Sequence, residues 1–115
     1  MFNKDDTFLV IFKILYYLYY NVKRGLQIEV KYFRHDKLGI NENYMCFILN
    51  QLEEKKYIKG FSKTFAFNNA PEDVKKITIT LDGIEYLESD KMQVMKTYLQ
   101  DKKQLEWWLE ATESN

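Results

Sequence analysis

The stretch Leu38-Gly39-Ile40-Asn41 decides how the chain is expected to fold. Glycine relieves the steric clash of a left-handed turn, the flanking leucine and isoleucine can enter a core, and the asparagine can cap a following helix. Helical patterns lie on both sides of this turn, over residues 31–38 before it and over about residues 42–56 after it. A short helix, a tight turn and a longer helix predict a helix-turn-helix junction.

Strands are predicted on both sides of this helix pair. Residues 57–67 favour a strand, and residues 77–81 alternate apolar side chains with threonine. The intervening residues 68–73 contain the only proline and several turn formers, so the two strands should pair as a hairpin with a long tip. The alternation in residues 27–30 predicts one more short strand. This order is that of a winged helix-turn-helix with a two- to three-stranded antiparallel wing.

Further helices are predicted at the two ends of the chain. The first should begin at Asp5, Asp6 or Thr7 and end near Arg24, with Gly25 in the left-handed capping position. Its expected core stripe consists of Phe8, Ile11, Phe12, Leu15, Leu18, Tyr19 and Val22. A short helix from residue 82 and a longer one over about residues 91–111 complete the pattern. We therefore predict one α+β, mainly helical domain over residues 1–115, with a core at about 7–88 and an added C-terminal helix.

Charge and composition narrow the classes of function. The 17 acidic residues cancel the 17 lysines and arginines, so no overall basic field draws the chain toward nucleic acid. The apolar run over residues 8–20 is shorter than the roughly 20 residues that a membrane-spanning helix needs. Asp5 and Asp6 interrupt any signal-peptide pattern, and the lone Cys46 cannot form an internal disulfide. We expect a cytoplasmic chain without a membrane partner.

Reactive side chains are scarce. His35 and Cys46 are the only histidine and cysteine, and their spacing matches no metal-binding pattern. The four glycines stand isolated, so no phosphate-binding loop is present. The carboxylates of Glu53 and Glu54 point about 100° apart on a helix and cannot flank one substrate bond. We expect no catalytic residues, no metal site and no cofactor.

Two segments carry a family resemblance. Residues 38–60, followed by Ile79-Thr80-Leu81-Asp82-Gly83-Ile84-Glu85-Tyr86-Leu87, resemble the YjcQ-like family of small prophage-type winged-helix proteins over roughly residues 7–103. The resemblance implies that Thr80 or Asp82 caps the next helix, that Gly83 allows close packing, and that the chain is a bacterial or prophage-type DNA-binding transcriptional regulator. One departure is His35, which stands four residues before the turn glycine, where helix-turn-helix proteins usually have a small residue.

Duplex DNA is the predicted partner of the helix over residues 42–56. In a winged helix, this helix would enter the major groove and the hairpin would follow the backbone. The candidate base-contacting residues are Asn43, Asn50, Gln51 and Tyr44. The candidate phosphate contacts are Lys31, Arg34, Lys37, Lys55, Lys59, Lys63 and Lys75. The acidic Glu42, Glu53 and Glu54 of the same helix would repel phosphates.

Aromatic residues support an alternative, a winged-helix interaction module that does not bind DNA. The face of the first helix around Lys13 is rich in tyrosine, and a pair of tryptophans stands near the C-terminus. Such residues dominate the binding energy of protein interfaces. The same chain's C-terminal helix or a second subunit would cover them, the latter giving a homodimer through the first and C-terminal helices. The candidate interface residues are Tyr16, Tyr17, Tyr20, Trp107 and Trp108.

Overall fold

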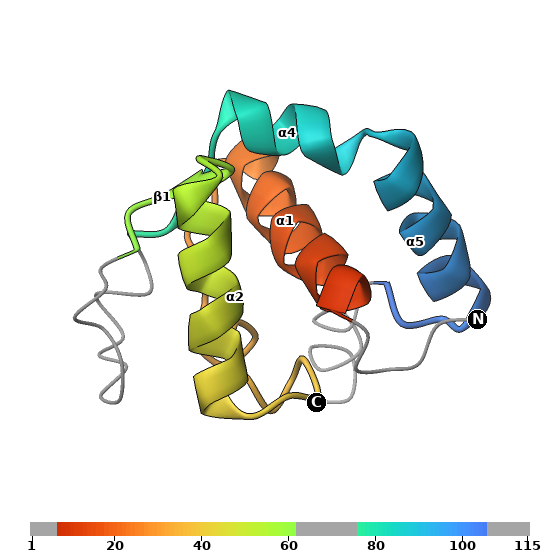
Figure 1. Cartoon of the computed structure of the whole chain (residues 1–115), viewed down its shortest axis with the longest axis horizontal. Helices are drawn as coiled ribbons and strands as arrows, with labels where there is room; N and C mark the ends of the chain where they lie inside the picture. Colours follow the sequence, from red (N-terminus) through yellow and green to blue (C-terminus); the bar gives the residue numbers. More distant parts are fainter. Residues whose placement is uncertain (1–6, 62–75, 106–115) are drawn as a thin grey trace.

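Helix α1 (Thr7–Arg24) runs through the middle of the molecule. The computed structural model describes residues 7–61 and 76–105. After α1 come α2 (Glu42–Glu54), β1 (Ile58–Lys59), β2 (Thr78–Ile79), α4 (Leu81–Leu87) and α5 (Asp90–Asp101). Figure 1 shows α1 between α2 and α5, with α4 across one end. The described chain is therefore α+β and mainly helical.

The core stripe predicted for α1 is confirmed at Ile11, Phe12, Leu15 and Leu18, and α1 is buried around most of its circumference. The buried residues of α1 are Leu9, Val10, Ile11, Phe12, Ile14, Leu15, Tyr17, Leu18 and Asn21. Phe8 and Val22, which were expected in the core, are 37% and 49% exposed. The physical reason is that β2, α4 and α5 all pack on α1, so more than one of its faces needs apolar side chains.

The end of α1 follows the sequence prediction. Gly25 has a φ of 68°, a left-handed conformation that glycine adopts without a Cβ clash. The Leu26 amide donates to the Asn21 carbonyl at 2.8 Å, which closes the last turn. The predicted boundary of the helix at Arg24 is confirmed.

Residues 26–40 form an irregular segment, so the strand predicted at 27–30 and the helix predicted at 31–38 are both wrong. Ile28 is the only buried residue of the predicted strand 27–30, and no strand in the described part of the chain pairs with these residues. Farther along, the Ile40 amide donates to the His35 carbonyl at 3.0 Å, while the His35 ring contacts the Ile40 carbonyl at 3.1 Å. These contacts fold residues 35–40 into a tight turn in place of a helix.

Helix α2 begins as the turn chemistry predicts. Gly39 has a φ of 76°, and Asn41 caps the helix by accepting from the Tyr44 amide at 2.8 Å. The inward face of α2 consists of Met45, Ile48, Leu49 and Leu52. Its last residue is Glu54, two residues before the predicted end, because Lys56 turns left-handed at a φ of 63°.

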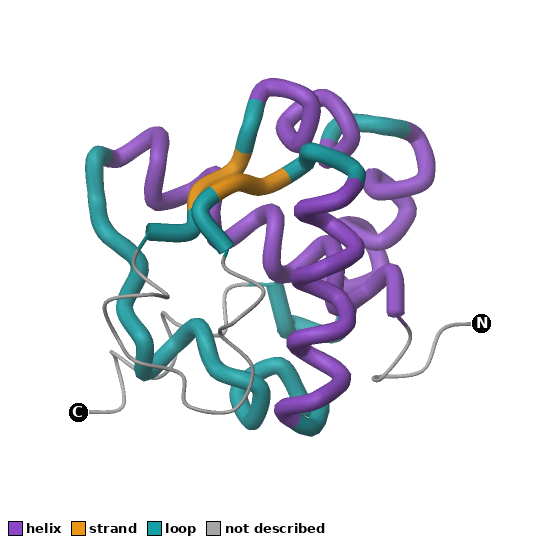
Figure 2. The backbone as a smooth tube through the Cα atoms, turned by 60° about the vertical axis from the view of Figure 1, so that its left-hand side comes forward, coloured by secondary structure: helices purple, strands orange, loops and turns teal. Residues whose placement is uncertain are grey.

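Strands β1 and β2 pair antiparallel, with Ile58 opposite Ile79 and Lys59 opposite Thr78 (Figure 2, orange). The predicted loop at 68–73 lies outside the described residues. Thr80 caps α4 by accepting from the Gly83 amide at 3.0 Å, and a Cβ on Gly83 would stand 2.1 Å from the Tyr57 carbonyl oxygen. The capping and close packing implied by the family resemblance are confirmed at Thr80 and Gly83.

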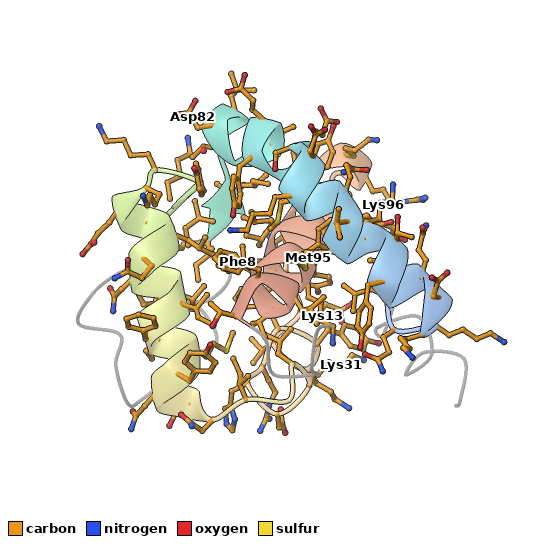
Figure 3. The ribbon with its side chains drawn as sticks, turned by 45° about the vertical axis from the view of Figure 1, so that its right-hand side comes forward. Phe8, Lys13, Lys31, Asp82, Met95 and Lys96 are labelled. Carbon is orange, nitrogen blue, oxygen red and sulfur yellow. The ribbon has the colours of Figure 1, made fainter. Side chains whose placement is uncertain are left out.

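Helix α5 returns along α1 and completes the core. Met92, Met95 and Leu99 are its buried residues, and Figure 3 shows the Met95 side chain beside α1. The predicted continuous helix over 91–111 is wrong, because α5 ends at Asp101 and Lys103 has a φ of 57°. The predicted helical residues 106–111 lie outside the described part of the chain.

Candidate nucleic-acid interface and aromatic groove

The outward face of α2 is polar with one aromatic ring at its centre. Its exposed residues are Asn43, Phe47, Gln51 and Glu54. The aromatic residue is Phe47, and 54% of its surface is exposed. Polar amides with an apolar ring between them can meet both the hydrogen-bonding edges and the methyl groups of bases in a major groove.

Gln51 is exposed, and the other three predicted base-contacting residues have different surroundings. Asn43 is exposed. The Tyr44 hydroxyl is hydrogen-bonded to the Thr7 hydroxyl, and its ring stacks with Phe47 at a centroid distance of 6.3 Å. The Oδ1 of Asn50 is buried, with no hydrogen-bond partner among the described residues. Of the three, Asn43 is therefore the one best placed to reach a base.

The acidic residues of α2 are less prominent than the sequence suggests. Glu42 and Glu53 are half-buried, and one carboxylate oxygen of Glu53 is buried altogether. Glu54 is exposed on the outward face. Of the three acids, only Glu54 is exposed on the face that a DNA phosphate would contact.

The predicted phosphate contacts fall into two groups. Lys31 lies 3.9 Å from Glu29, and Arg34 lies 3.2 Å from Asp36, so nearby carboxylates offset the charge of both. Lys37 is exposed in the turn before α2. After α2, exposed side chains of Lys55, Lys56 and Lys59 follow within five residues. Positive charge is therefore densest at the C-terminal end of α2, while the predicted contacts Lys63 and Lys75 lie outside the described residues.

The predicted interface at Tyr17 is wrong, because this residue belongs to the core. Tyr17 is 2% exposed, its hydroxyl accepts from the Glu29 amide at 3.1 Å, and its ring stacks with Phe33 at 6.0 Å. Burial raises the pKa of this hydroxyl, because a phenolate would lose its hydration. The hydroxyl stays protonated and holds residue 29 against α1.

The remaining interface residues lie near elements of the same chain. Tyr16 stacks with Phe12 at 5.5 Å and lines a hollow of about 330 Å³ together with residues of α4 and α5. The Arg24 guanidinium stands 4.6 Å from the centroid of the Tyr20 ring. Residues of α4 and α5 therefore lie beside the Tyr16 side of α1. The predicted interface residues Trp107 and Trp108 lie outside the described residues.

An aromatic groove opens between the start of α1, the side of α2, and α4, and sequence reasoning missed it. We define the aromatic groove by Phe8, Phe47, Lys55, Tyr57, Tyr86 and Lys91, which line a volume of about 410 Å³. Tyr57 and Tyr86 stack at 4.6 Å with their planes 11° apart, and the Lys91 ammonium lies 3.2 Å from the Phe8 ring centroid. Figure 3 shows Phe8 between α1 and α2. The lining of the aromatic groove comes from separate parts of the sequence, so no local pattern predicts the groove.

Potentially reactive groups have structural surroundings. Burial, with a smaller contribution from the Glu42 charge, raises the pKa of the Cys46 thiol, so less of it is the nucleophilic thiolate. The described residues contain no group of three or more side chains suited to hold a metal ion. None of the described helices has the length and apolar character needed to cross a membrane.

Comparison with known proteins assigns the family. A family model described as YjcQ protein matches residues 12–107. The chain belongs to the YjcQ family. The searches of curated proteins and of solved structures gave no match.

The part of the chain that matches the YjcQ family holds most of the described elements. It includes α2, both strands, α4 and α5 completely, and α1 from Phe12 onward. The outward face of α2 and most of the aromatic groove therefore lie in the YjcQ-matched region. Thr7 and Phe8, at the start of α1, precede it.

Proposed function

We propose that this YjcQ-family chain is a cytoplasmic winged-helix DNA-binding protein without catalytic activity, acting as a bacterial or prophage-type transcriptional regulator. The observation that carries the proposal is the outward face of α2, where Asn43, Phe47 and Gln51 are exposed beside a lysine-rich C-terminal end. Amide side chains can read base edges, and lysines can neutralise phosphates.

The order of elements from α2 onward supports the same proposal, while the helix predicted before the turn, at residues 31–38, is not formed. A turn segment leads into α2, and α2 is followed directly by the antiparallel pair of β1 and β2. This order is compatible with a recognition helix followed by a wing. Of the three acids of α2, Glu42 and Glu53 are half-buried, and Glu54 is exposed on the outward face.

The proposal predicts salt-dependent binding to duplex DNA. Fluorescence anisotropy with a labelled duplex of about 30 base pairs, between about 50 and 200 mM salt, would measure the slope of log K against log salt concentration. Lys37→Gln with Lys59→Gln should reduce the size of this slope by about 2, or about 1 for each lost phosphate contact.

A matched control changes the same charge elsewhere. Lys96→Gln with Lys102→Gln, on and just after α5, should leave the slope within experimental error. Equal losses in both double variants would contradict an interface at α2. A chain that leaves duplex DNA unbound at the lowest salt would contradict DNA binding and favour the alternative, an interaction module that self-associates.

A further inference from the structure

We propose that the aromatic groove is a binding site for a small organic anion, specifically a carboxylate carried on a planar aromatic body. This site differs in chemistry from the proposed DNA-binding face, although both include Phe47, Gln51 and Lys55. The proposal does not depend on DNA binding. It rests on the shape, the walls and the charge of the groove.

The walls of the groove suit a flat apolar ring. Tyr57 and Tyr86 stack on each other and both line the groove, so the pair forms one aromatic wall of it. Phe47 forms part of the lining from α2, and its large exposed fraction leaves apolar surface that a ligand could cover. Aromatic rings that stack on one another are stabilised beyond the area they bury, which favours an aromatic ligand over a linear alkyl chain.

The charge of the groove selects an anion. Lys55 from the end of α2 and Lys91 from the start of α5 both line it, and no acidic side chain is among the described residues of the lining. The Lys91 ammonium already lies over the Phe8 ring at 3.2 Å, which places a positive charge against an apolar surface. A carboxylate there would gain charge-assisted hydrogen bonds.

The volume distinguishes a small molecule from a docked helix or peptide. At about 410 Å³, the groove lies near the lower end of the roughly 300–1,000 Å³ range of small-molecule sites. A fused two-ring carboxylate is of suitable size, whereas an amphipathic helix needs a longer trough for anchors on successive turns.

The test uses the whole chain without DNA, so its result is independent of the proposed regulatory function. The chain labelled with ¹⁵N is titrated with 2-naphthoate and, separately, with the neutral 2-naphthamide, and amide shifts are followed by NMR. We expect 2-naphthoate to shift the amides of residues lining the groove and to bind about tenfold or more tightly than the amide, because only the anion can pair with the lysines.

Two variants and one control locate the site. Lys55→Gln with Lys91→Gln should weaken 2-naphthoate binding about tenfold or more while leaving the affinity for 2-naphthamide nearly unchanged. Phe47→Ala should weaken both ligands. The control, Lys59→Gln with Lys96→Gln, removes the same charge outside the groove lining and should change neither. The altered side chains have exposed or half-buried surroundings, and dispersed NMR spectra would verify the fold of each variant.

Several results would overturn the proposal. They are equal affinity for the anion and the amide, equal losses in the lysine double variant and its control, shifts confined to residues outside the groove, and no shift at low millimolar ligand. Groove shifts caused by an acidic aromatic peptide but not by 2-naphthoate would also overturn it and would assign the groove to protein docking.

Discussion

At the scale of single residues, Tyr17 links the irregular segment to α1 through one buried hydroxyl. The Glu29 amide donates to this hydroxyl at 3.1 Å, and Phe33 stacks on the ring. A hydrogen bond of this kind contributes only modestly to stability, but an amide that loses its partner on burial is costly. The hydroxyl therefore acts as a specific tie between residues that are 12 apart in the sequence.

Replacing Tyr17→Phe should lower the free energy of unfolding by about 1–2 kcal/mol, because the Glu29 amide loses its acceptor while the ring remains. Tyr19→Phe is the matched control, since Tyr19 is half-buried and its ring, which the substitution keeps, faces Lys23. It should change stability little. Urea unfolding followed by circular dichroism measures both, and an equal loss in the two variants would contradict the role given to Tyr17.

At the scale of elements, Thr80 joins the exit of α2 to the start of α4. Its hydroxyl donates to the Lys56 carbonyl at 2.6 Å and accepts from the Gly83 amide at 3.0 Å. The Thr80 amide also donates to the Tyr57 carbonyl at 3.0 Å. One residue thus caps a helix and fastens the end of another, which aligns the short strands between them.

Replacing Thr80→Val keeps the shape but removes both hydroxyl hydrogen bonds. We expect the free energy of unfolding to fall by about 2 kcal/mol, of which about 1 kcal/mol is the lost helix cap. Thr97→Val on α5 is the control, because its exposed hydroxyl donates only to the Gln93 carbonyl within its own helix. Thermal unfolding should separate the two variants, and indistinguishable midpoints would count against this role of Thr80.

The turn chemistry around the helices could be predicted from the sequence. Gly25 and Gly39 have left-handed conformations, Asn41 caps α2, and Thr80 with Gly83 opens α4 as the family resemblance implies. Each depends on one residue and its immediate neighbours. Local rules of capping and glycine conformation therefore hold wherever the deciding contacts are local.

Periodicity failed where burial comes from several directions or from isolated contacts. Tyr17 was predicted at an interface but lies in the core, because α1 is covered on several faces. Ile28 gives an alternating pattern although no strand pairs with it. His35 bonds with Ile40 and closes a turn where a helix was predicted. Such outcomes depend on tertiary partners, which a single sequence does not display.

The candidate site was predictable only in part. The exposure of Asn43 and the cluster of lysines after α2 could be predicted from the composition and the expected length of the helix. The aromatic groove does not, because the stacking of Tyr57 on Tyr86 brings together residues that are 29 positions apart. The fold places these residues together, and nothing in their local spacing indicates it.

At the scale of the whole molecule, α5 is part of the core and not an appendage to it. The core predicted at residues 7–88 leaves α5 out, yet Met92, Met95 and Leu99 are buried and the helix packs on α1. Because α1 is apolar on several sides, removing α5 would expose one of its faces to water. The fold therefore needs both ends of the described chain.

Replacing Leu99→Ala should lower the free energy of unfolding by about 2–5 kcal/mol, the range for truncating a buried leucine. Leu99 is 1% exposed, whereas the neighbouring Gln100 is exposed, so Gln100→Ala is the matched control and should stay within about 0.5 kcal/mol of the parent chain. Chemical unfolding measures both. A small loss at Leu99 would show that α5 docks loosely.

The central position of α1 matters while the chain is being made. The ribosome delivers Thr7–Arg24 before the β2, α4 and α5 residues that cover it, and these end only at Asp101. At a synthesis rate of roughly 5–20 residues per second, the most apolar helix waits about 4–15 seconds for its cover. The nascent chain is therefore prone to aggregate during this interval, and α1 is the segment that a chaperone binding apolar stretches would shield.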